Sequence, residues 1–197
     1  MSISSIKHPI IDMVDKFVKC DVERQANQFN QDEKFNSKLF KSLGDVGLLG
    51  STVGTEYGGA GLSVYEVLMI HQRLAVSDPA FCLSYLAHTL LFANNLQVNG
   101  SEEQKLKYLP SICSGDLIGG MGMSEAVAGT DVLGMRTTIL RDNDGYRVNG
   151  SKMWITNGPV GDVFLVYGKN ANNRLSMAIV ERNDPGFSSE SPIRNKC

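Results

Sequence analysis

Residues 122–134 read Gly-Met-Ser-Glu-Ala-Val-Ala-Gly-Thr-Asp-Val-Leu-Gly, and residues 152–158 read Lys-Met-Trp-Ile-Thr-Asn-Gly. The first segment is rich in small residues and lies where a helical pattern of apolar residues gives way to an alternating one. The second segment contains the only tryptophan of the chain. Because the span between them has the pattern of a hairpin, we expect the two segments to lie side by side.

The bulk properties indicate a globular protein and exclude several classes of function. The chain has 197 residues, 42% of them hydrophobic, and a formal net charge of −2 from 19 basic and 21 acidic residues. Without a basic stripe, nucleic acid is not expected as the main partner. No apolar run approaches the roughly 20 residues that span a bilayer. We therefore expect a cytoplasmic protein, or one of the mitochondrial matrix if a transit peptide has been removed.

The four cysteines are far apart in the sequence and fit neither a disulfide framework nor the close spacing of a zinc site. They are Cys20, Cys82, Cys113 and Cys197. We expect them to be reduced thiols, as is usual inside cells.

The first part of the chain has helical periodicity and clear helix-start signals. Ser63 and Glu66, and likewise Ser101 and Gln104, have the spacing of a capping box. The expected helices cover residues 10–30, 36–46, 63–76, 80–98 and a last one from 101, which Pro110 limits. Glycines in 55–62 predict a loop. We assign residues 1–117 to a helical domain.

The second part has a period near 2 and predicts an antiparallel β region. The expected strands cover residues 137–141, 146–148, 153–156, 163–167 and 175–180. They are separated by an Asp142-Asn143-Asp144-Gly145 turn, a tight Asn149-Gly150 turn and a polar turn at 169–174. We assign residues 118–197 to a β domain, so the fold class is α+β.

Three other features of the sequence have plain structural interpretations. The glycines at 58, 59 and 61 could bring amides to a phosphate, but no strand precedes them and their spacing fits no phosphate-loop pattern, so a turn is favoured. His8, His71 and His88 have no acid or cysteine at ligand spacing and are interpreted as structural. Ser124 lacks the glycine-flanked elbow of a hydrolase nucleophile.

The two segments quoted first could hold a planar cofactor. Serine, glycine and threonine residues expose amides and hydroxyls, and Trp154 would add an apolar face with the Thr156 hydroxyl at its edge. Taken singly, a lone tryptophan is usually a core residue and such a loop is usually only a loop. The interpretation therefore depends on the two segments together.

Several segments in register resemble the acyl-CoA dehydrogenase family. The flavin-binding signature of that family is similar to residues 123–131 and 154–158. Further matches are Glu-Tyr-Gly-Gly-Ala-Gly at 56–61, Leu-Ser-Tyr-Leu-Ala-His at 83–88 and Glu-Gln-Lys-Leu-Lys-Tyr-Leu-Pro at 103–110. The resemblance covers about 35–187 and is closest to the isovaleryl-CoA dehydrogenase branch.

The resemblance implies FAD bound between an N-terminal helical domain, a barrel- or sandwich-like middle β domain and a C-terminal helical bundle, usually in a homotetramer. It also implies that the flavin ring is bordered by Met121, Met123, Ser124, Gly129 and Thr130, and flanked by Trp154, Ile155 and Thr156. By the same resemblance, the Thr156 hydroxyl would lie near flavin N5. The acyl-CoA would approach Thr130, Asn173 and Arg174.

The implied reaction is α,β-dehydrogenation of a short or branched acyl-CoA thioester, in fatty acid or branched-chain amino acid catabolism. A carboxylate base removes the α-proton, a hydride passes to flavin N5, and the electrons then pass to an electron-transfer flavoprotein.

The sequence departs from the family pattern in two ways. Ala126 stands where the family usually has proline. The family's catalytic glutamate would lie beyond Cys197, within a missing bundle, so no catalytic residue is assigned here. The alternatives are a truncated, non-catalytic subunit that binds flavin, acyl-CoA or a partner, and a related flavin oxidase.

Overall fold

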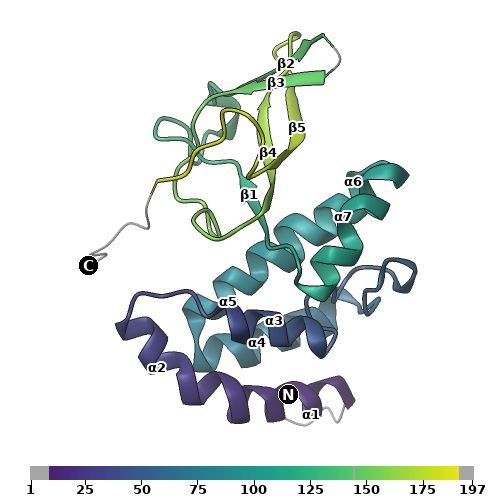
Figure 1. Ribbon diagram of the computed structural model, residues 1–197, viewed down its shortest axis with the longest axis vertical. Helices are drawn as coiled ribbons and strands as arrows, with labels where there is room; N and C mark the ends of the chain where they lie inside the picture. The colour runs from purple at the N-terminus through teal and green to yellow at the C-terminus, as the bar shows by residue number, and fades with distance from the viewer. Residues whose placement is uncertain (1–8, 144, 191–197) are drawn as a thin grey trace.

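The protein consists of a group of helices with a β-sheet on one side of it, as the computed structural model shows (Figure 1). The structure describes residues 9–143 and 145–190. The interpretations given above for His8, Asp144 and Cys197 fall outside these residues. The expected order, a helical domain followed by a β domain, is confirmed.

Two of the expected helices are continuous but contain a wider π-helical turn. The first comprises α1 (Pro9–Phe17), η2 (Val18–Val22) and α2 (Glu23–Gln31), and the second comprises α5 (Pro79–Leu86), η4 (Ala87–Asn94) and α6 (Asn95–Asn99). Hydrophobic periodicity finds such helices but does not reveal a π-helical turn, because burial of the apolar face looks similar in both.

The remaining helices are α3 (Ser37–Asp45), α4 (Val64–Ser77) and α7 (Glu102–Ser114), with the 3₁₀ turns η3 (Thr55–Tyr57) in the glycine loop and η5 (Val132–Gly134). Both expected capping boxes are formed. Pro110 lies inside α7 and does not end it, contrary to expectation. Burial of Ile112 and Cys113 outweighs the one backbone hydrogen bond that a proline removes, and the helix continues to Gly115, whose φ is +76°.

Five strands of the described residues form one sheet. They are β1 (Gly119–Gly122), β2 (Thr138–Asp142), β3 (Gly145–Asn149), β4 (Val163–Lys169) and β5 (Leu175–Glu181). β4 is central: it pairs antiparallel with β5, parallel with β1, and parallel with β2 at Thr138 and Lys169. β2 and β3 form an antiparallel hairpin.

Two expectations for the β domain are wrong. The sheet is mixed and not purely antiparallel, because β4 pairs in parallel with β2 and with β1, a strand that the sequence did not reveal in the glycine-rich run before Met123. Residues 153–156 do not form a strand, and no tight hairpin turn leads into them. Trp154 has φ +60° and Asn157 has φ +65°, and positive φ angles interrupt a strand.

The sheet is docked on the helices through a shared apolar core. One cluster of buried side chains lies among the helices and includes Phe40, Leu43 and Tyr85. A second cluster combines residues of η4 and α7, such as Phe92 and Ile112, with residues of β4. The position of the sheet is thus fixed by packing against η4 and α7.

His88 lies at this junction and is fully buried. Its Nε2 is 3.0 Å from the carbonyl oxygen of Ile112, while its Nδ1 accepts a hydrogen bond of 3.1 Å from the amide of Gly119. The ring is therefore neutral, with its proton on Nε2. Burial lowers the pKa of His88 to about 4, and the interaction with the Ile112 carbonyl only partly opposes this shift. The structural interpretation of His88 fits this position.

We predict that His88 lowers the stability of the folded protein at acidic pH. The unfolded chain takes up a proton near pH 6.5, whereas the folded chain resists protonation down to about pH 4. The free energy of unfolding should therefore fall by about 3 kcal/mol as the pH drops from 6.5 to 4. Urea unfolding at several pH values measures this slope, and the variant His88→Gln should lose it. An equal slope in both proteins would contradict the prediction.

Candidate functional site

The two segments singled out in the sequence lie side by side, as expected. The amide of Met153 donates a hydrogen bond of 2.9 Å to the carbonyl oxygen of Ser124. The ammonium of Lys152 donates one of 2.9 Å to the carbonyl oxygen of Met123. The first segment thus leaves β1 at Gly122 and passes directly along the start of the second.

Trp154 is not a core residue. Its side chain is 65% exposed, and its positive φ turns the backbone away from an extended path. This conformation is uncommon for a residue other than glycine, asparagine or aspartate, and such positions cluster at functional sites. The interpretation of this lone tryptophan as a buried packing residue is therefore excluded.

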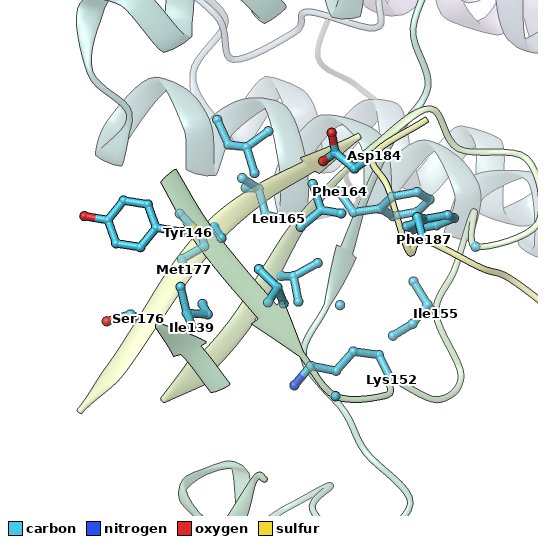
Figure 2. A pocket seen from close by; sticks show the side chains of 18 of the residues that line it. Ile139, Tyr146, Lys152, Ile155, Phe164, Leu165, Ser176, Met177, Asp184 and Phe187 are labelled. Carbon is cyan, nitrogen blue, oxygen red and sulfur yellow. The ribbon is translucent and has the colours of Figure 1, made fainter. Parts of the chain in front are cut away.

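An open groove of about 2120 Å³ runs along the sheet and receives residues from both segments. Trp154, Ile155 and Thr156 line it together with Gly122 and Ala126. Figure 2 shows Lys152 and Ile155 on one side of this groove, with the stacked rings of Phe164 and Phe187 beyond them. Leu83 and Ser84 of α5 contribute to the wall on the helical side.

The other expected site residues lie outside the groove lining. Met121 packs against the second apolar cluster, Met123 and Ser124 are half-buried, and Gly129 and Thr130 are exposed. Asn173 and Arg174 are exposed in the β4–β5 turn. Their neighbours in that turn, residues 170–172, do line the groove.

Of the hydroxyls in the two segments, that of Thr156 lines the groove, while those of Ser124 and Thr130 lie outside its lining. The side chains of Ser124, Thr130 and Thr156 make no hydrogen bond to another described residue, whereas the backbone carbonyl of Ser124 is already used. A planar group with acceptors at its edge would find an exposed indole and hydroxyl donors on the adjoining loops. This combination of an apolar face with a few polar groups is typical of cofactor sites.

Glu125 is an important residue that the sequence did not reveal as part of the site. It is 8% exposed and accepts hydrogen bonds from the amides of Arg136 and Thr137, from the Thr137 hydroxyl and from the ammonium of Lys152. Burial alone would raise the pKa of this carboxyl, but the hydrogen bonds outweigh burial and lower it to about 2. The carboxylate is therefore charged at neutral pH and unsuited to act as a base.

Asn157 is a second such residue. Its side-chain amide donates hydrogen bonds of 3.0 Å to the carbonyl oxygens of Ser84 and Gly119, so it ties the Trp154 loop to α5 and to β1. Its Oδ1 is buried and has no partner among the described residues. The guanidinium of Arg182 holds the residues that follow by donating to the carbonyls of Gly158 and Gly161. The C-terminal side of the loop is therefore fixed by two side chains.

Comparison with known proteins identifies the class of this fold and site. Residues 7–116 match the acyl-CoA dehydrogenase N-terminal domain, and residues 120–197 match the acyl-CoA dehydrogenase middle domain. The chain therefore belongs to the acyl-CoA dehydrogenase family, a family of flavin-dependent oxidoreductases. No described helix is long and apolar enough to cross a membrane.

Particular relatives give finer detail. Mitochondrial isovaleryl-CoA dehydrogenase of Pongo abelii is 38% identical over 188 residues, which are 91% of this chain and 44% of that enzyme. Glutaryl-CoA dehydrogenase of Mycobacterium smegmatis superposes with a TM-score of 0.91 at 29% identity, over 98% of this chain and 50% of that one. An acyl-CoA dehydrogenase of Bacillus anthracis complexed with FAD superposes with a TM-score of 0.88 at 32% identity, over 97% of this chain and 34% of that one. The chain thus spans half or less of the length of these relatives.

We predict that Asn157→Asp destabilises the protein although it preserves the shape of the side chain. The substitution removes both N–H donors and places a carboxylate oxygen against two carbonyl oxygens. The free energy of unfolding should fall by about 3 kcal/mol. Denaturant unfolding measures this loss, and Asn172→Asp in the exposed β4–β5 turn is the matched control. Equal stability of the two variants would contradict the role given to Asn157.

Proposed function

We propose that this chain is the helical and middle portion of an FAD-dependent dehydrogenase of short or branched acyl-CoA thioesters. One observation carries the proposal: the Ser124 and Trp154 segments, which are far apart in the sequence, are hydrogen-bonded to each other beside a large groove. The similarity to isovaleryl-CoA dehydrogenase supports a short, branched acyl group.

The residues present fit a flavin. The exposed indole of Trp154 offers a flat apolar face, and Ile155 and Thr156 continue the same wall. In the other segment, a side chain at Gly129 would meet no atom within 4 Å, so the backbone there is open to a ligand. We assign the edge of the ring system to Met121, at the end of β1, and to Met123, Ser124, Gly129 and Thr130 of the segment that follows it.

When bound, FAD supplies a hydride acceptor at flavin N5 for α,β-dehydrogenation of the thioester. The Thr156 hydroxyl, which lines the groove, would donate a hydrogen bond to the flavin and so favour its more negative, reduced form. Trp154 covers one face and excludes water. Thr130, Asn173 and Arg174 contact the acyl-CoA. None of these side chains is a suitable base for the α-proton.

The proposal extends to partners of the whole protein. The electrons leave through an electron-transfer flavoprotein, and the working assembly is a homotetramer, as the family resemblance implies.

The first test is spectroscopic. Protein expressed from the intact reading frame should purify with a visible flavin absorption band. Under anaerobic conditions, isovaleryl-CoA should bleach that band, because the substrate reduces the flavin. Palmitoyl-CoA, with its long straight chain, serves as the comparison and should bleach it far more slowly. Purified protein without flavin, or flavin that no acyl-CoA bleaches, would count against the proposal.

The second test concerns Thr156. The variant Thr156→Val keeps the shape of the side chain and should retain FAD, but it removes the hydroxyl donor. The rate of flavin reduction in stopped-flow experiments should fall on the order of 100-fold. Thr138→Val on β2 is the matched control, since Thr138 does not line the groove, and it should reduce at the wild-type rate. Equal rates in the two variants would remove Thr156 from the mechanism.

A further inference from the structure

Among the described residues, one ion pair connects the two segments that adjoin the groove. The Nζ of Lys152 lies 2.8 Å from Oε1 of Glu125, and the same Nζ donates to the carbonyl oxygen of Met123 at 2.9 Å. Glu125 directly follows Ser124, and Lys152 lies two residues before Trp154. One ammonium group therefore holds both segments together.

Of the ion pairs among the described residues, this one is the least exposed to solvent. The side chains of Lys152 and Glu125 are only 10% and 6% exposed. For comparison, the Lys41–Asp116 pair has side chains that are 43% and 65% exposed. An exposed pair of that kind contributes little, whereas a buried charge that loses its partner is strongly unfavourable.

No other charged side chain of the described residues contacts this carboxylate. Arg136 contributes its backbone amide while its side chain is exposed, and the carboxylate of Asp131 accepts from the amide of Gly134. The remaining neighbour of the ammonium is the sulfur of Met135, at 3.8 Å. Lys152 is therefore the cation that balances Glu125.

A buried ion pair is often no more stabilising than a well-packed apolar pair, so stability alone does not account for this arrangement. Its geometry defines the separation of the two segments, because the ammonium of Lys152 donates to both Met123 and Glu125 of the first segment. We propose that Glu125 and Lys152 are positioning residues that set the distance between the Ser124 and Trp154 sides of the flavin site. This inference rests on the proposed function and adds a role that neither residue needs in the reaction itself.

The test compares flavin binding in four proteins: wild type, Lys152→Met, the double variant Glu125→Gln/Lys152→Met, and Lys41→Met. The readouts are the FAD dissociation constant at pH 6 and pH 8 and the wavelength of the bound flavin band. In the wild type the dissociation constant should differ little between the two pH values, because the ammonium keeps Glu125 ionised at both.

In Lys152→Met the dissociation constant should rise at least about tenfold at pH 8. The rise should be similar at pH 6, because the amides of Arg136 and Thr137 and the Thr137 hydroxyl still donate to Glu125 and keep it ionised. The double variant should also bind FAD more weakly than the wild type, with a shifted flavin band. Lys41→Met breaks an exposed pair away from the groove and should bind FAD as the wild type does.

Two results would overturn the inference. One is wild-type affinity and spectrum in the double variant, which remains informative even if Lys152→Met fails to fold. The other is a lower melting temperature for Lys152→Met with an unchanged dissociation constant at both pH values, since the pair would then stabilise only the fold. Absence of flavin from the wild type would instead overturn the proposed function, and this inference with it.

Discussion

Gly119 is hydrogen-bonded through both its amide and its carbonyl oxygen, and the arrangement of the whole site depends on this residue. Its amide donates to His88 of η4, while its carbonyl oxygen accepts from Asn157 of the Trp154 loop. A side chain at Gly119 would lie 2.5 Å from the ring of Phe92, so only glycine allows this close approach. Helices, sheet and loop thus meet at one residue, and the orientation of the groove follows from it.

The helices and their starts could be predicted from the sequence because their determinants are local. A capping box such as Ser63 with Glu66 needs only residues of one turn, and apolar periodicity shows the buried face. The effect of Pro110 was predicted wrongly, because α7 continues as far as the packing of Ile112 requires. The residues that pack against Ile112 are distant in the sequence. The strand expected at 153–156 failed for a similar reason. Trp154 has a left-handed backbone because its neighbours are held by long-range hydrogen bonds. The amide of Met153 donates to the carbonyl of Ser124, and the side chain of Asn157 donates to the carbonyl of Ser84.

The candidate site was accessible to sequence reasoning only in part. Resemblance pointed to the residues on the surface of the two segments, such as Ser124 and Trp154. It did not reveal Glu125, although this residue lies within the signature, because its partners at 136, 137 and 152 come together only in the fold. Buried polar groups need hydrogen-bond partners, and those partners cannot be assigned without knowing which segments of the chain are neighbours in the fold.

The π-helical segment η4 has a consequence for how the helical layer meets the sheet. In such a turn the backbone bonds run from residue i to i+5, which widens the helix by one residue per turn. His88 and Ala93 are five apart, both are buried, and η4 contacts β1. The amide of Gly119 on β1 donates to His88, and the ring of Phe92 lies against the same glycine, so the spacing of side chains along this widened helix decides which of them reach the strand. A deletion within 87–94 would turn the side chains on either side of it relative to one another and move His88 or Phe92 away from Gly119.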